Sequence, residues 1–369
     1  MIIENTLIDY VKHETRPFDE FALNDCDLLV FSTLIYSSFE NYDVFTKAGS
    51  SVKLSALGEV APLYFFVENG PNISGTLALL DAVCKSPRFA NVALEGFEEA
   101  NDEARGLQYG CGFFVISPEQ VVVAYRGTTI ELNAWREDLN MGTYPAVPCQ
   151  IKAMASLTIA HETYPQATLC LCGHSKGGAC AEYAALFTPD IANDAVERCV
   201  SFDGPALTRV GTAACPELQG YDELVEARYA ATDIEMVRYV FPAAIGLMLE
   251  NGSSAHLRFA EAVDASKTHD PVLIKVEEGQ IVCHEPSKRE LTEGGFVSRW
   301  ASQLTLEERV LFVHYVITLC AENGITVDLS SDSIIAILRA ALKALPRSSG
   351  DQRRNVAHML LKALKALKA

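Results

Sequence analysis

Residues 169–186 read Leu-Cys-Leu-Cys-Gly-His-Ser-Lys-Gly-Gly-Ala-Cys-Ala-Glu-Tyr-Ala-Ala-Leu. An apolar strand runs into Gly-His-Ser-Lys-Gly at 173–177, and a helix of small residues follows. This order is typical of the G-x-S-x-G nucleophile elbow, a sharp strand-to-helix turn that exposes a serine hydroxyl above a sheet. We expect a strained backbone at Ser175, tolerated because the residues two positions away on either side have no Cβ. The pentapeptide alone occurs by chance in roughly one chain in ten of this length, so the flanking strand and helix make it informative.

Composition excludes two classes of partner. The chain has 369 residues and a formal net charge of −18. Nucleic acids and anionic membranes both bind through basic patches, so this surface as a whole suits neither of them. The histidines and cysteines lack the spacing of metal ligands. We therefore predict no cofactor.

The cysteines and the start of the chain indicate a location. Eleven cysteines, an odd number without a C-x-x-C pair, are typical of free thiols in a reducing compartment. The first twenty residues include acidic side chains and lack the apolar core of a signal peptide. No segment approaches the ~20 apolar residues of a membrane span. We therefore expect a cytoplasmic protein.

Strand-like runs alternate with helical segments over the first 300 residues. The apolar, β-branched runs lie at 113–117, 121–125, 167–172, 198–202 and 236–241. The first two predict a hairpin, and a short run at 279–283 predicts a late edge strand. The segments expected to be helical are 4–13, 25–39, 75–85, 93–104 and 151–164. This alternation predicts an α/β fold with a mostly parallel central sheet covered by helices.

From about residue 300 the sequence changes to helical segments. Thr305 and Glu308 form a capping box that predicts a helix to Glu322, and further helices are expected over 331–345 and 352–368. The last is amphipathic, and its apolar face suits a membrane surface, a partner or the protein itself. We expect it to pack on the protein. The chain is thus divided into a first domain over 1–300 and a helical C-terminal extension over 301–369.

A serine nucleophile needs a base to remove its proton, and the base needs a carboxylate to fix its tautomer. After a nucleophile elbow the chain order is serine, acid, histidine. His269 lies in a predicted loop at a sheet edge, where the base should come from, and we predict it as the base. His256 and His284 stay open as alternatives. His314 and His358 fall within predicted helices.

Asp203 is the predicted acid. It directly follows the strand at 198–202, so its side chain projects at the carboxyl end of the sheet, where the nucleophile also lies. The Asp-Gly-Pro that it begins could equally be a turn in which the aspartate caps backbone amides. Asp233 precedes its strand, at the wrong end. Asp270 is next to His269 and would have difficulty reaching its imidazole.

Negative charge that develops on a substrate carbonyl requires two backbone N–H donors. One belongs to the residue after the nucleophile, Lys176. The second is expected from the Arg-Gly-Thr at 126–128, which ends a strand, and Thr128 can add its hydroxyl. An ordinary strand-end turn would explain the same three residues.

Four separated motifs, spread over roughly residues 5–330, resemble lipase-like sequences. Val-Val-Ala-Tyr-Arg-Gly-Thr at 122–128, followed by Trp135 and Asp138, is similar to the class 3 lipase pattern. The motifs that look closer still to a bacterial family of lipase-like α/β-hydrolases are Gly-His-Ser-Lys-Gly-Gly at 173–178, Ser-Phe-Asp-Gly-Pro at 201–205 and His-Asp-Pro at 269–271. The resemblance implies an α/β-hydrolase fold over the first domain.

The resemblance also implies roles for single residues. Ser175 would be the nucleophile and His269 the base, with the oxyanion site around Thr128 and Lys176. Asp138 would brace the loop that carries Thr128.

The sequence departs from the family at the acid. Class 3 lipases carry their acid just after the next strand, where this chain reads Phe-Pro-Ala-Ala at 241–244 and has no carboxylate. The departure favours Asp203.

Together these residues predict a serine hydrolase that cleaves a carboxylic ester of a small molecule or a lipid through an acyl-enzyme on Ser175. Residues 205–232 and 242–262 are candidates for a lid or an acyl-binding wall. Two alternatives use the same sequence. One is a catalytically inactive member that binds a ligand or a partner, and the other is an acyltransferase or thioesterase that uses the same residues.

Overall fold

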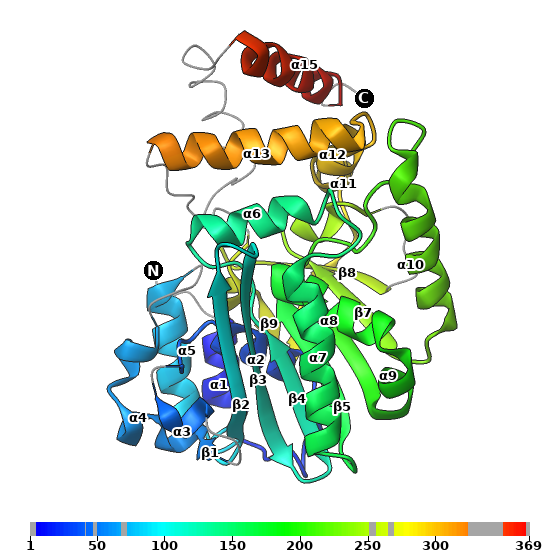
Figure 1. The fold of residues 1–369 in the computed structure, drawn as a ribbon. Coiled ribbons are helices and arrows are strands. Elements are labelled where there is room, and N and C mark those ends of the chain that lie inside the picture. Colours follow the sequence, from blue (N-terminus) through cyan, green and yellow to red (C-terminus); the bar gives the residue numbers. More distant parts are fainter. Residues whose placement is uncertain are drawn as a thin grey trace.

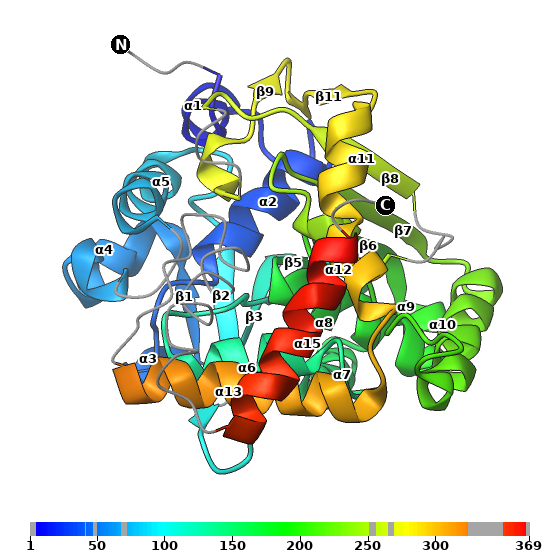
Figure 2. The same cartoon turned by 90° about the horizontal axis from the view of Figure 1, so that it is seen from above.

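The computed structural model describes residues 5–40, 42–46, 50–67, 72–250, 256–264, 269–323 and 350–366. A mixed β-sheet lies between two layers of helices (Figures 1 and 2). Within the described residues the main sheet has nine strands in the order β1-β2-β3-β4-β5-β6-β7-β8-β11, and β9 and β10 form a separate pair. Strands β4 to β8 run parallel, and the remaining neighbours pair antiparallel. The α/β fold is therefore confirmed, with a parallel half and an antiparallel half.

The elements have the following bounds. The strands are β1 (Ser51–Lys53), β2 (Ala93–Asp102), β3 (Leu107–Ser117), β4 (Gln120–Tyr125), β5 (Thr168–His174), β6 (Val196–Phe202), β7 (Glu235–Val240), β8 (His256–Ala260), β9 (Val276–Glu277), β10 (Gln280–Ile281) and β11 (Cys283–His284). The helices are α1 (Leu7–His13), α2 (Asp25–Leu34), α3 (Asp43–Thr46), α4 (Leu57–Val60), α5 (Ile73–Lys85), α6 (Leu132–Asn140), α7 (Pro148–Thr163), α8 (Lys176–Phe187), α9 (Pro189–Ala195), α10 (Gln219–Ala231), α11 (Lys288–Gly294), α12 (Phe296–Ala301), α13 (Leu306–Asn323) and α15 (Gly350–Ala366). Short 3-10 turns are η1 (Leu54–Ala56), η2 (Leu63–Phe66), η3 (Pro216–Leu218), η4 (Ile245–Leu247) and η5 (Pro271–Leu273).

Each central strand buries both of its faces. In β4, Val122 and Ala124 belong to a core shared with α1, α2 and α5. Val121, Val123 and Tyr125 of the same strand belong to a second core shared with α7 and α8. Successive side chains of a strand point to opposite faces, so a strand covered on both sides is apolar at every position. This explains why the predicted strands read as continuous apolar runs.

A third apolar cluster lies beyond the carboxyl ends of the parallel strands. It joins α6, α12, α13 and α15, which Figure 1 shows stacked past that edge. Figure 2 shows α15 lying across α12 and α13, with which it makes contact. The cluster includes Trp135, Trp300, Phe312 and Met359, all at least nine-tenths buried. The C-terminal helices thus pack on the protein, as expected for the tail.

Most predicted elements are found close to their expected bounds. The hairpin is β3–β4, and the strands expected at 167–172, 198–202 and 236–241 are β5, β6 and β7. The capping box of α13 is formed, because the Thr305 N–H donates to Glu308 Oε2 (2.9 Å) and the Glu308 N–H donates to Thr305 Oγ1 (3.2 Å). The helix expected over 331–345 lies outside the described residues.

The helix expected over 93–104 is wrong, because this segment forms β2. Pairing with β3 over 93–95 and 98–102, on either side of an irregularity, makes the segment a strand. Two of its acidic side chains form ion pairs with basic residues outside the strand. Glu98 pairs with Lys152 (2.5 Å) and Glu99 with Arg126 (2.5 Å).

The late edge strand is also different from the prediction. Gln280–Ile281 pairs with β9 outside the main sheet, and Cys283–His284 forms the edge strand β11 on β8.

We predict that Gly177→Ala destabilises the protein by about 1–3 kcal/mol. A Cβ at this position would lie 2.1 Å from the Tyr125 carbonyl oxygen, so α8 would have to move away from the sheet. Gly220→Ala in α10 is the matched control, because a Cβ there meets nothing within 4 Å. It should be neutral or stabilise the helix by up to about 1 kcal/mol. Urea unfolding measures both free energies, and equal stability of the two variants would contradict the close packing of α8.

Candidate functional site

Ser175 lies between the end of β5 and the start of α8 and has φ 57° and ψ −131°. Such a conformation costs a residue with a side chain about 1–3 kcal/mol and persists only where its surroundings enforce it. A Cβ on Gly173 would lie 2.2 Å from the backbone carbonyl carbon of Gly177. The glycines therefore allow the helix to cross the strand end at contact distance. The strained turn expected at Ser175 is confirmed.

Asp203 and His269 contact each other directly. The distance from His269 Nδ1 to Asp203 Oδ2 is 2.6 Å, and the carboxylate is fully buried. The other carboxylate oxygen, Oδ1, accepts the backbone N–H groups of Phe241 (3.1 Å) and Gly246 (2.7 Å). Asp203 thus caps backbone amides with one oxygen and contacts the imidazole with the other. The position predicted for the acid is compatible with this geometry, and its role as the acid stays a prediction.

Ser175 and His269 line the same pocket, together with Thr128, Asp138 and Lys176. The structure therefore brings the predicted nucleophile, base and oxyanion residues to one place, with Asp203 behind the histidine. His269 follows β8 in the chain.

The alternative histidines lie elsewhere. His256 is exposed at the start of β8, and His284 contacts Glu290 (2.9 Å) on the sheet edge. His314 and His358 are exposed on α13 and α15. None of these four lines the pocket.

His174, which the sequence did not single out, lies against His269. The two ring centroids are 4.5 Å apart, and His174 Nδ1 lies 3.0 Å from the Tyr36 hydroxyl. Burial lowers the pKa of His174 well below its ordinary value, and the nearby imidazole of His269 lowers it further. A neutral, buried ring thus supports the face of His269. Only its position before the serine could have indicated this role.

The loop after β4 is packed tightly beneath the pocket. A Cβ on Gly127 would lie 2.0 Å from the Tyr36 hydroxyl and 2.5 Å from the carbonyl oxygen of His174. The next residue, Thr128, donates its hydroxyl to Asp138 Oδ2, so Asp138 holds this loop as the resemblance implied. Lys176 is the first residue of α8, and its backbone N–H has no acceptor within the helix.

The side chain of Lys176 forms a buried ion pair that the sequence analysis missed. Its Nζ donates to Glu137 Oε2 (2.9 Å) and to the Gln108 carbonyl oxygen (2.8 Å), and both charged groups are at most 1% exposed. Burial opposes the charge on Lys176, but the Glu137 carboxylate outweighs it and the pKa of the ammonium is raised. A lysine in a helix of small buried residues needs an acidic partner. This feature of the sequence could have indicated that Lys176 forms a buried ion pair.

Asp138 carries an unusual charge environment. Burial raises the pKa of its carboxyl to about 6, although the Lys176 ammonium and the Thr128 hydroxyl favour the ionised form. Its Oδ1 is buried without a hydrogen-bond partner among the described residues. Glu137 and His269 are the other titratable groups that act on it.

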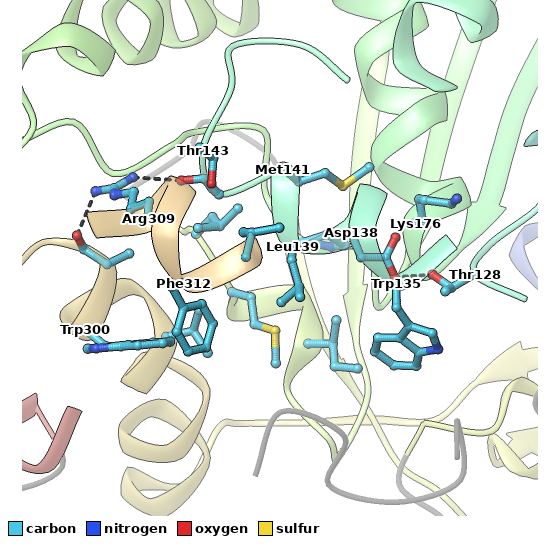
Figure 3. A pocket seen from close by; sticks show the side chains of 18 of the residues that line it. Thr128, Trp135, Asp138, Leu139, Met141, Thr143, Lys176, Trp300, Arg309 and Phe312 are labelled. Atoms are coloured by element: carbon cyan, nitrogen blue, oxygen red, sulfur yellow. Dashed lines mark hydrogen bonds between the residues drawn. The ribbon is translucent and has the colours of Figure 1, made fainter. Parts of the chain in front are cut away.

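The pocket is mainly apolar, with a volume of about 160 Å³. Figure 3 shows Thr128, Asp138 and Lys176 at one end and Trp300, Phe312 and Arg309 at the other, with Leu139 and Met141 between them. Ile245, Met248 and Leu249 come from the segment expected to form a wall. The wall contributed by α12 and α13 could not be predicted from the sequence, because a helical tail carries no pattern that places it over a distant turn.

These features define a mixed α/β protein with a Ser-His-Asp arrangement beside an apolar pocket. A family model described as Mbeg1-like matches residues 83–318, and the chain belongs to this Mbeg1-like family. No curated protein matches the chain. Within the described ranges, no helix has both the length and the hydropathy needed to cross a membrane. The same residues contain no group of three or more His, Cys, Asp or Glu side chains placed to hold a metal ion.

We predict that Lys176→Met costs about 3–5 kcal/mol of folding free energy, because it leaves the Glu137 carboxylate buried without its cation. Adding Glu137→Gln should recover part of the loss, with a coupling energy of about 1–3 kcal/mol. Lys85→Met is the matched control, since Lys85 pairs with Asp81 on the exposed face of α5 and such pairs are worth at most about 1 kcal/mol. Urea unfolding of Lys176→Met, Glu137→Gln, the double variant and Lys85→Met measures these free energies. Equal losses for Lys176→Met and Lys85→Met would show that the buried pair is not formed.

We predict that Asp138→Asn changes how stability depends on pH. The raised pKa of about 6, against an ordinary value of 3.8, means that the folded protein keeps a proton that the unfolded chain loses first. The free energy of unfolding therefore falls by up to about 3 kcal/mol as the pH rises from about 4 to about 6, because the unfolded chain ionises over this range while the folded protein stays protonated. Asn does not titrate, so the stability of wild type relative to the variant should fall over this range. A difference that is constant between these pH values would refute the assignment.

Proposed function

We propose that the protein is a serine hydrolase of the α/β-hydrolase fold, related to the class 3 lipases, that cleaves a carboxylic ester through an acyl-enzyme on Ser175. The observation that carries the proposal is the 2.6 Å contact between His269 and the buried Asp203, beside a pocket that Ser175 and His269 both line. The chain order supports it, because the serine follows β5, the acid follows β6 and the histidine follows β8.

The contact with Asp203 fixes the roles of the two imidazole nitrogens. Nδ1 carries its proton toward the carboxylate, so Nε2 is the basic nitrogen. Ser175 Oγ attacks the ester carbonyl while Nε2 takes its proton, and a tetrahedral oxyanion forms. The ester C–O bond then breaks, and the alcohol leaves with the proton from Nε2. Water, deprotonated by the same nitrogen, releases the acid and restores Ser175.

The oxyanion is assigned to backbone donors. Lys176 supplies the N–H that follows the nucleophile, and Thr128 supplies one from the loop after β4. The hydroxyl of Thr128 is directed to Asp138 while Asp138 is ionised, so it serves the loop and not the oxyanion. Asp138 is therefore a positioning residue in this scheme.

We predict that a fluorophosphonate probe labels the wild-type protein at Ser175 and fails to label Ser175→Ala. Asp203→Asn should lower the rate of ester hydrolysis by about 10⁴-fold, because the imidazole then adopts the wrong tautomer. His269→Ala should abolish labelling, whereas the control His256→Ala should leave it unchanged, since His256 is exposed away from the pocket. Mass spectrometry of the labelled peptide and a spectrophotometric ester assay provide the two measurements.

The outcomes separate the alternatives. A folded wild-type protein whose Ser175 is inert to the probe would overturn the proposal and favour a ligand-binding member of the family. Labelling together with acyl transfer to an added alcohol in preference to water would make the enzyme an acyltransferase that uses the same residues.

A further inference from the structure

The two ends of the pocket beside Ser175 differ in polarity. Thr128, Asp138 and Lys176 lie at one end in Figure 3. Trp300 and Phe312 lie at the other, together with Arg309, whose guanidinium is bonded to backbone carbonyl oxygens. Leu139 and Met141 line the space between them. A ligand that fits this shape has one polar group at the serine and an apolar tail that extends toward α12 and α13.

The far end of the pocket is held in place firmly. Phe312 packs edge-on against Trp300, with ring centroids 4.7 Å apart, and the Trp300 Nε1 donates to the Met359 carbonyl oxygen of α15 (3.2 Å). Arg309 of α13 is 4% exposed and donates to backbone carbonyl oxygens of Gly142 (2.9 Å), Val210 (2.9 Å) and Ala301 (2.7 Å). This guanidinium joins α13 to the loops after α6 and β6 and to the end of α12. The two aromatic rings therefore form a firmly held wall at this end of the pocket.

The size of the pocket limits the tail. An engineered apolar cavity of about 150 Å³ binds benzene, which has six carbon atoms, and this pocket measures about 160 Å³. We infer that the pocket accepts one unbranched acyl chain of about six carbon atoms and that Phe312 and Trp300 set this limit. The inference deepens the proposed function and rests on it for the ester chemistry, but not for binding.

Binding can be measured without catalysis, because both tryptophans of the chain, Trp135 and Trp300, line the pocket. Tryptophan emission therefore reports on occupancy with no signal from elsewhere in the protein. The probes are methyl ketones, which carry a carbonyl group like that of an ester and cannot be hydrolysed. We predict that 2-octanone, with a six-carbon tail, binds Ser175→Ala at least about 10-fold more tightly than 2-butanone or 2-tetradecanone does, as measured by the change in tryptophan emission.

Two variants of the pocket should shift this preference in opposite directions. Phe312→Ala lengthens the pocket and should improve binding of 2-tetradecanone by at least about 10-fold. Ala301→Leu fills it and should weaken binding of 2-octanone by about the same factor. Leu311→Ala is the control, because Leu311 is exposed on the neighbouring position of α13 and does not line this pocket. In the wild-type background, p-nitrophenyl acetate, hexanoate and dodecanoate test the same preference by hydrolysis.

The two proposals fail in different ways. The inference is overturned if Phe312→Ala and Ala301→Leu both keep the chain-length preference of the parent protein while each still binds 2-octanone or is still labelled at Ser175. That outcome leaves the hydrolase proposal intact. A six-carbon preference in ketone binding, shifted by the variants, supports the inference even if no ester is hydrolysed, and the hydrolase proposal then fails alone. Equal binding of all three ketones by Ser175→Ala also overturns the inference.

Discussion

The carboxylate of Asp203 connects the three strand ends from which the site is built. It is fully buried, and a buried charge is tolerated only where its hydrogen bonds are made. Asp203 Oδ1 takes N–H groups from Phe241 and Gly246 in the loop after β7, and Oδ2 takes the imidazole supplied after β8. The position of His269 and the shape of the loop after β7 are therefore fixed by one group. Displacing either partner would leave a charge without compensation.

Two buried cations, Arg238 and Lys176, bond the elements around the Asp203 carboxylate to one another. Arg238 of β7 donates to the carbonyl oxygens of Gly204 (3.0 Å) and Gly246 (2.6 Å), which flank the Asp203 carboxylate, and pairs with Glu182 of α8 (3.0 Å). Lys176 in turn ties the first turn of α8 to Glu137 of α6. Buried ion pairs contribute little net stability, but each requires one geometry. They make the arrangement of α6, α8 and the strand ends specific, and these are the elements that position the pocket.

The sequence was sufficient to predict an element wherever the interactions that form it lie within the same stretch of chain. The elbow could be predicted because a strained serine, two glycines and a small-residue helix must occur together, and the central strands because burial on both faces makes every residue apolar. The chain order then selected Asp203 and His269. The strand at 93–102 was missed because its stability comes from β3 and from ion pairs with Arg126 and Lys152, none of which is local.

The pocket escaped sequence-based prediction for the same reason. Its far wall comes from Trp300 and Phe312, more than a hundred positions after Ser175, and the contact is made through backbone carbonyl oxygens that bond Arg309. Every residue has a backbone carbonyl group, so the residue types do not show which carbonyl oxygens will bond a distant arginine. The partner of Lys176 was likewise hidden, because Glu137 looks like any acidic residue on an amphipathic helix.

The position of Asp203 shows how close the ends of neighbouring parallel strands lie. The resemblance to class 3 lipases places the carboxylate after the strand that is β7 here, and this chain has Phe-Pro-Ala-Ala there. Neighbouring strands lie about 4.8 Å apart, so a carboxylate after β6 is displaced by only about one strand spacing. Asp203 adopts φ 51°, a left-handed backbone that turns its side chain toward β7 and the histidine. The loop after β7 has no carboxylate at 241–244 and supplies two N–H donors to Asp203 Oδ1. One carboxylate is thereby held by the ends of two neighbouring strands, with its second oxygen free to contact the imidazole of His269.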